Sequence, residues 1–193
     1  FEKNNFMKIS IKLSLISLTL FFLIVISCNT KKNLSDNKTT LIESRETYRI
    51  MFYNVENLFD TEDDPEKRDE EFLPEGDRYW SNYRYNQKLN NIYKVIVGVG
   101  GWDLPPIVGL CELENRHVLE DLLSRTPLYK SDYKIIHYES PDRRGIDVGL
   151  LYRTEYFTPI SHHPIRVVWP KSIGTGTTRD ILYVTGTTNN SDT

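Results

Sequence analysis

Two apolar, β-prone runs, each ending in polar side chains, set the pattern of the chain. The first occupies residues 48–60 and closes in Asn, Glu and Asp side chains, and the second occupies residues 107–111 and is followed by Glu112. Aromatic and β-branched residues favour strands. A short apolar run that stops at polar residues is typical of a buried strand whose carboxyl end reaches a site. We therefore expect two strands that deliver polar groups at their carboxyl ends.

The alternation of side chains along a strand predicts which of these positions share a face. In the first run Ile50, Phe52 and Asn54 fall on one face, and Glu56 joins them if the chain stays extended. In the second run the same rule groups Val108, Leu110 and Glu112. A carboxylate at the end of a buried strand is costly unless a cation or donor lies beside it. Adjacent strands would bring Asn54 and Glu112 to one sheet edge, where a metal ion is the simplest partner.

Helical periodicity appears between the two runs and again after the second. The first pattern ends at glycines 98, 100 and 101, and Asn115 is the expected cap of the second. Apolar residues at helical spacing define the buried sides: Tyr85, Leu89, Ile92, Tyr93 and Ile96, then Val118, Leu119, Leu122 and Leu123. Strand, helix and strand then form a βαβ-like unit, and the fold class is α/β.

Further strands follow. Residues 133–138 and 146–152 flank a turn and predict an antiparallel hairpin, and strands are also expected at 165–169 and 180–186. Asp147 lies among apolar residues, so we expect it to be paired, for instance with an arginine, in a structural role. The histidines are scattered, and no carboxylate near them in the sequence marks one as a base.

The amino-terminal segment has the features of an export signal. Lys8 and Lys12 precede an apolar stretch that ends at Cys28, and it is shorter than the ~20 residues needed to span a bilayer. The stretch resembles the lipobox of bacterial lipoproteins, which predicts a lipid-anchored protein of the cell envelope acylated at Cys28. An ordinary signal peptide or a short membrane anchor is the alternative. The predicted segments are 1–27 (upstream residues and signal), 28–46 (flexible tether) and 47–193 (folded domain).

Composition narrows the possible partners. The formal net charge of -3 argues against binding nucleic acid by broad electrostatic attraction, although Arg143 and Arg144 could make local contacts. The two cysteines, Cys28 and Cys111, lie in unrelated segments, so no disulfide is expected and Cys111 is interpreted as a small core residue. No protein partner is inferred.

Three segments in order, residues 52–60, 108–115 and 144–152, resemble the endonuclease/exonuclease/phosphatase family. The resemblance covers about residues 47–193 and implies a four-layer α/β sandwich that hydrolyses phosphoesters with Mg²⁺ or Mn²⁺. By the same resemblance, Glu112 matches the metal-ligand glutamate, Glu56 an acidic position near the metal, and Asn54 a catalytic asparagine that positions the phosphate. Glu56 could equally be a loop carboxylate that caps a turn. Arg144 could bind a substrate phosphate, or be a surface arginine beside a turn glycine.

The leading hypothesis is a metal-dependent phosphodiesterase that acts on nucleic acid. A phospholipid or inositol phosphate phosphoesterase of the same family, and a non-catalytic surface-binding module on the same fold, are the alternatives. The family's carboxyl-terminal Asp-x-Asn and Asp-His motifs do not occur in these residues. The sequence therefore predicts an amino-terminal portion of the fold, truncated at its carboxyl end and inactive in isolation.

Overall fold

The computed structural model describes residues 48–101, 103–170, 172 and 176–188. The predicted signal and tether, residues 1–27 and 28–46 including Cys28, lie outside this range. Within it, no helix combines the length and the apolar character that crossing a membrane requires. The elements, in chain order, are β1 (Ile50–Leu58), η2 (Glu70–Phe72), α2 (Asn82–Gly100), β2 (Ile107–Leu113), α3 (Arg116–Ser124), η3 (Pro127–Lys130), β3 (Tyr133–His137), β4 (Asp147–Arg153), β5 (Phe157–Ile165) and β6 (Ile181–Thr188).

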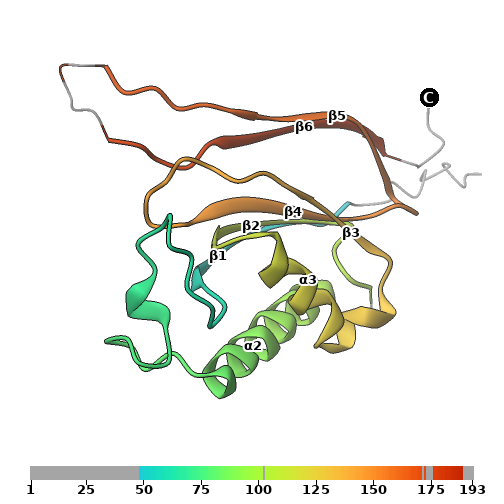
Figure 1. The fold of residues 1–193 in the computed structure, drawn as a ribbon. Coiled ribbons are helices and arrows are strands. Elements are labelled where there is room, and N and C mark those ends of the chain that lie inside the picture. Colours follow the sequence, from blue (N-terminus) through green and yellow to red (C-terminus); the bar gives the residue numbers. More distant parts are fainter. Residues whose placement is uncertain (1–47, 102, 171, 173–175, 189–193) are drawn as a thin grey trace, which may run out of the picture. The chain divides into compact units, whose positions relative to one another are not determined.

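Two sheets and two long helices form the folded part. The four-stranded sheet has the order β1-β2-β4-β3, and β5 pairs with β6 in a separate two-stranded sheet. Strands β1 and β2 are parallel, while β2–β4 and β3–β4 are antiparallel. Helices α2 and α3 cover one face of the four-stranded sheet, and the β5–β6 hairpin lies on the other side (Figure 1). The α/β class, the parallel β1–β2 pair and the β3–β4 hairpin are thus confirmed.

The two helices form where the periodicity predicts them. Ser81 caps α2 by accepting a hydrogen bond from the Arg84 N–H, and Asn115 caps α3 by accepting one from Val118. The buried face of α2 consists of Tyr85, Leu89, Ile92, Ile96 and Gly100. A β-carbon on Gly149 of β4 would lie 2.7 Å from Leu119 of α3. The absence of a side chain at Gly149 therefore lets α3 pack closely onto the sheet.

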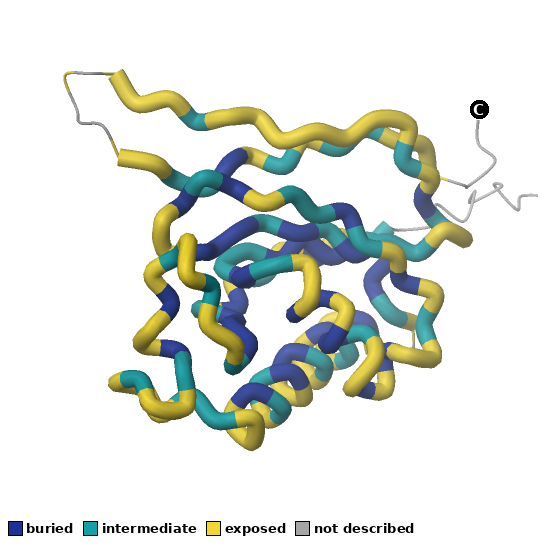
Figure 2. Tube along the Cα trace, in the orientation of Figure 1, coloured by how far each residue is buried: buried dark blue, intermediate teal, exposed yellow. Residues whose placement is uncertain are grey.

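The core lies on the face of β1 opposite to the one carrying Ile50 and Phe52. Met51 and Val55 are buried, whereas Ile50 is 69% and Phe52 71% exposed. The alternation is as predicted, but the run is apolar on both faces, so the sequence does not indicate which side the helices cover. Figure 2 shows the buried positions concentrated between the sheet and the helices, with exposed positions along the β5–β6 hairpin.

The prediction that Glu112 shares a face with Val108 and Leu110 is wrong, because the backbone at the strand ends is irregular. Glu112 has φ 65°, and the register between β2 and its neighbours shifts between Cys111 and Leu113. Because Leu110 and Leu113 are both in the helix-facing core, the extra residue turns Glu112 away from Val108 and Leu110. Glu56 and Asn57 also have positive φ, 55° and 63°, so β1 is not regularly extended at Glu56.

The strand predicted at residues 165–169 is wrong. The observed strand is β5, Phe157–Ile165, and its register with β6 runs from Phe157 opposite Thr188 to Ile165 opposite Ile181. Most β5 side chains are exposed. Its sequence therefore lacks the apolar pattern of a core strand, and backbone pairing with β6 determines its position.

Candidate functional site

The carboxyl ends of β1 and β2 bring the predicted site residues into one region. Asn54 is the register partner of Cys111, the residue immediately before Glu112. The Asn54 Oδ1 accepts a hydrogen bond of 2.8 Å from the Glu56 N–H, which closes a local turn at the strand end. Asn54 and Glu56 are exposed, and Glu112 is partly buried. Two parallel neighbours thus present an amide and two carboxylates at one edge of the sheet.

Two cations that the sequence did not single out lie beside these groups. Arg179, just before β6, approaches Glu112 with 3.4 Å between its Nη1 and the carboxylate Oε1. Lys88 of α2 donates from Nζ to the Glu56 carbonyl oxygen at 2.6 Å. Burial lowers the pKa of Lys88, while the charges of Glu56 and Glu112 act in the opposite direction. No local pattern marks Lys88 or Arg179, because packing alone brings their segments to the strand ends.

Arg144 reaches the same region from the loop between β3 and β4. Its Nε and Nη2 donate to the two oxygens of Asp142 at 3.0 and 2.7 Å, while its side chain stays 60% exposed. These hydrogen bonds raise the pKa of Arg144, and the negative charge of Glu112 acts in the same direction. The guanidinium is therefore held in place by Asp142 and within electrostatic range of Glu112.

Asp147 is paired, but with a histidine. His137 Nε2 lies 3.1 Å from Asp147 Oδ2, and the Ser140 N–H donates to Asp147 Oδ1. Both side chains are almost fully buried, at 2% and 1% exposure. The partners are ten residues apart, on two strands, so no sequence motif reveals the pair.

A groove borders the site on the face of the sheet opposite the helices. It is lined by side chains of the four-stranded sheet, of the segment between β5 and β6 and of the start of β6, among them Phe52, Cys111, Val148, Trp169, Arg179 and Leu182. Cys111 is a free thiol, partly buried rather than in the core, and burial raises its pKa. Arg179, which pairs with Glu112, is part of the groove lining.

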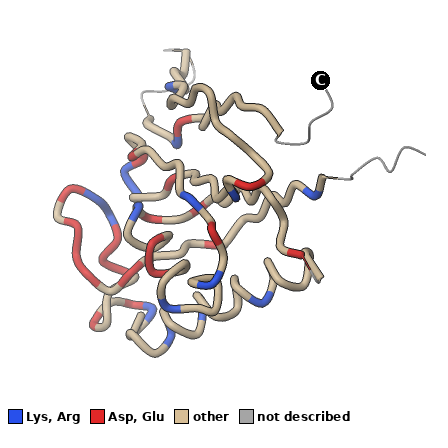
Figure 3. Tube along the Cα trace, turned by 90° about the vertical axis from the view of Figure 1, so that its right-hand side faces the viewer, with Lys and Arg blue, Asp and Glu red and all other residues tan. Residues whose placement is uncertain are grey.

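Acidic residues are frequent along the loop of residues 61–76 (Figure 3), and Asp60, Asp69 and Glu114 are buried where this loop joins the sheet. Glu114 accepts a hydrogen bond from the Asp60 N–H at 2.8 Å and is 5% exposed. Burial raises the pKa of Glu114 to about 8, and the negative charges of Asp60, Asp69 and Asp64 also raise it. The hydrogen bond from the Asp60 N–H acts in the opposite direction and lowers the pKa. The cluster thus retains a proton in the folded protein near neutral pH.

This raised pKa predicts that stability falls with increasing pH. Unfolded, Glu114 loses its proton near its ordinary pKa of 4.5, whereas the folded protein holds it until about 8. Between these values the unfolded state binds fewer protons, so the free energy of unfolding decreases as pH rises. Glu114→Gln mimics the protonated group and should raise stability at pH 8 by ~1–2 kcal/mol. Urea unfolding at pH 5 and pH 8, in the presence of a chelator, measures the free energy of unfolding of wild type and Glu114→Gln, with Glu120→Gln as the control. If the free energy of unfolding changed with pH in Glu114→Gln as much as in wild type, the prediction would be contradicted.

Comparisons with known proteins identify the family. One solved structure, the human Nocturnin catalytic domain with bound sulfate anion, aligns with 20% identity and a TM-score of 0.39 over 55% of this chain and 38% of that domain. No curated protein sequence matches the chain significantly. A family model described as "Endonuclease/Exonuclease/phosphatase family" matches residues 49–193. Since that match covers most of the chain, the protein belongs to the endonuclease/exonuclease/phosphatase family, a group of phosphoester hydrolases of nuclease and phosphatase type.

Proposed function

We propose that the protein is a metal-dependent phosphodiesterase acting on nucleic acid, with Mg²⁺ or Mn²⁺ held by Glu112 and Glu56. The observation that carries this proposal is the parallel pairing of β1 with β2, which sets Asn54 beside Cys111 and Glu112. The chain covers 38% of the human domain that it matches. The activity is proposed for the whole protein that contains these residues.

The residues at the strand ends fit a hard dication. Glu112 and Glu56 supply carboxylate oxygens, the donors that Mg²⁺ prefers. The contact of Glu112 with Arg179 is long, at 3.4 Å, and the carboxylate is 22% exposed, so it is accessible to an ion. When bound, such an ion withdraws charge from a phosphoryl group and orients it for attack by water.

The protein's own side chains supply the phosphate contacts in this proposal. Because the Asn54 Oδ1 is engaged by the Glu56 N–H, its Nδ2 is the atom left to donate to a phosphoryl oxygen. Arg179 and Lys88 add positive charge next to Glu112 and Glu56. These groups bind and orient the phosphate, and Asn54 does so without adding charge.

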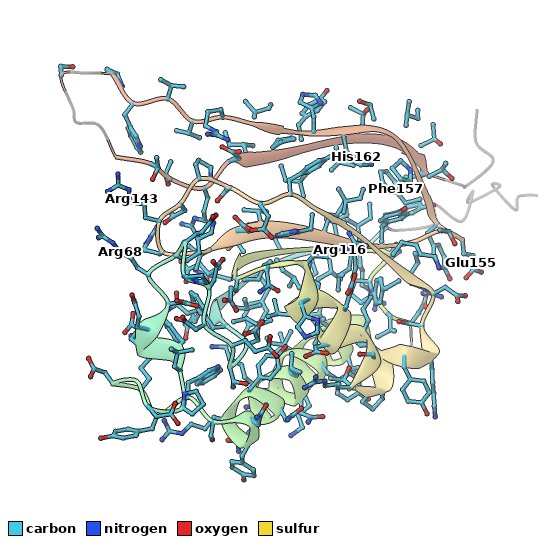
Figure 4. All side chains as sticks on the ribbon, viewed as in Figure 1. Arg68, Arg116, Arg143, Glu155, Phe157 and His162 are labelled. Atoms are coloured by element: carbon cyan, nitrogen blue, oxygen red, sulfur yellow. The ribbon has the colours of Figure 1, made fainter. Side chains whose placement is uncertain are left out.

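A basic rim favours a polymeric phosphodiester as the substrate. Arg68 and Arg143 come from two loops joined by a backbone hydrogen bond from Arg68 N to the Arg143 carbonyl. Figure 4 shows both at the same side of the molecule. Together with Arg144, these exposed arginines could follow a phosphate backbone beyond the reacting group. A single phosphate head group would use fewer of them.

The test compares substrates with the natural polypeptide. Single- and double-stranded DNA, RNA, sphingomyelin and inositol phosphates are incubated with Mg²⁺, with and without EDTA. We expect Mg²⁺-dependent cleavage of nucleic acid, lost in Glu112→Gln. Preferential hydrolysis of sphingomyelin or of inositol phosphates would replace this assignment by a phospholipid or inositol phosphate phosphoesterase of the same family. Binding without hydrolysis of any substrate would favour the non-catalytic module.

We also propose that the protein is exported and anchored to a membrane through a lipid on Cys28. This rests on the sequence alone, where an apolar stretch shorter than a membrane span ends at that cysteine. A lipid-anchored domain would meet its substrate at the surface of the envelope. Bacterial cells fed radiolabelled palmitate should label the wild-type protein but not Cys28→Ser. Equal labelling of both would refute the anchor.

A further inference from the structure

A second cluster of ligand-type side chains lies at the same end of the sheet, where Asp147 is the register partner of Leu113, the last residue of β2. His137 closes β3, Asp147 opens β4, and Glu139 lies in the connection between them. One potential ligand atom from each lies within 4.8 Å of the others, and within the described residues this is the one group of three or more such side chains that meets that criterion. The connection therefore folds so that an imidazole and two carboxylates converge.

The three side chains are arranged as metal ligands often are. One ring nitrogen of His137 and one oxygen from each carboxylate lie within 4.8 Å of one another, and His137 Nε2 is 3.1 Å from Asp147 Oδ2. One imidazole nitrogen binds one ion, and ligands of a tetrahedral zinc ion with bonds of about 2.0–2.2 Å lie roughly 3.3 Å apart. The exposed Glu139 side chain would therefore move closer by up to ~1.5 Å on binding. The Ser140 N–H holds the other oxygen of Asp147 and fixes its orientation. Such an outer hydrogen bond is common around metal ligands.

Charge at the cluster also favours a cation. The carboxyl groups of Glu139 and Asp147 each have an oxygen in the cluster. The ammonium group of Lys67 donates to the Ser140 carbonyl. Two carboxylates thus lie together beside one imidazole. Glu139 is 57% exposed, which leaves an entry path for an ion.

We propose that His137, Glu139 and Asp147 form a second metal site that takes a transition-series dication such as Zn²⁺. An imidazole ligand suits zinc better than it suits Mg²⁺ or Ca²⁺. The site is separate from Glu112, because Asp147 alternates with Gly149, which faces α3, whereas Val148 lines the groove on the opposite face. Three protein ligands leave a fourth position for water.

The location of the site gives it a structural role. The connection between β3 and β4 also carries Asp142 and Arg144, and Arg144 lies within electrostatic range of Glu112. An ion bound to both ends of this connection would hold its base closed. The second site would thereby stabilise the loop that positions Arg144.

Calorimetric titration of the full chain with ZnCl₂, after removal of metals by a chelator, tests the proposal. Wild type should bind one Zn²⁺ at this site, and Glu139→Gln should bind it at least ~10-fold more weakly. Glu139 is the main variant because it is the most exposed of the three ligands and its replacement leaves the core intact. Glu120→Gln, a surface control, and Glu112→Gln should both retain this binding. Equal affinity in wild type and Glu139→Gln, or no binding by wild type, would overturn the proposal.

Cobalt provides a second readout that reports ligand identity. Co²⁺ in place of Zn²⁺ should give visible absorption of four- or five-coordinate geometry in the wild type, weakened in Glu139→Gln and His137→Gln. If His137→Gln fails to fold, the Glu139 variant still decides. A thiolate-to-cobalt charge-transfer band would assign the ion to a cysteine and overturn the proposal as well.

Discussion

Replacement of Glu112 by glutamine should reduce nucleic-acid hydrolysis by the natural polypeptide by ~10²–10³-fold, as expected when one charged group of a preorganised site is removed. Glutamine has nearly the same shape but cannot carry the negative charge that attracts a dication. Glu112 lies one residue after Cys111, the register partner of Asn54, and its carboxylate is 22% exposed. The loss should therefore appear in activity and in Mg²⁺ affinity, and both are measurable by steady-state kinetics and calorimetry.

Two controls separate a metal role from a structural one. Glu120→Gln changes an exposed carboxylate that pairs with Arg116 on α3, and it should leave activity unchanged. Thermal unfolding of Glu112→Gln should stay close to wild type, because the contact with Arg179 is long and partly exposed. Full activity in Glu112→Gln would withdraw the metal role of this residue. A large loss of stability would show that Glu112 acts mainly through the fold.

Met51→Ala should lower the free energy of unfolding by about 2–4 kcal/mol, as for large-to-small changes in a packed core. Met51 is 6% exposed and belongs to the cluster between the sheet and the helices. Ile50→Ala, one position earlier on the same strand, should cost less than ~1 kcal/mol, because Ile50 is 69% exposed. Urea unfolding of the two variants and wild type measures the difference.

This pair tests directly which face of β1 packs against α2. The two residues are neighbours on one strand and both are apolar, so propensity alone cannot explain a large difference between them. Equal losses of unfolding free energy, or a larger loss for Ile50→Ala, would contradict the assignment of the core to the face of β1 that carries Met51. Leu110→Ala on β2 serves as a positive control, because its side chain is fully buried in the same cluster.

Much of the architecture could be read from the sequence. The helical spacing of Tyr85, Leu89, Ile92 and Ile96 is also their burial pattern in α2. Asn115 caps α3 as expected, and Asn54 and Glu112 come from strands that do lie side by side. Each of these features depends on local propensity or on the strand–helix–strand order of consecutive elements. The roles of Asn54, Glu56, Glu112 and Arg144 stay predictions.

Other features depend on residues far apart in the chain. The sequence predicted that Asp147 would be paired, with an arginine as one example, and its partner is His137, which two antiparallel strands bring close. Lys88 and Arg179 reach Glu56 and Glu112 from α2 and from the segment before β6. Strand β5 lies at Phe157–Ile165 because β6 pairs with it there, although its side chains are mostly exposed.

The amino-acid pattern by itself determined that two strands would end in amide and carboxylate groups, because strand propensity and side-chain alternation are local properties. Only the tertiary structure decided which face of β1 meets the helices, since both of its faces are apolar and contact with α2 selects between them. It also decided the direction of Glu112. One positive backbone angle at this residue adds a bulge that alternation cannot anticipate, and turns the carboxylate away from the core toward Arg179.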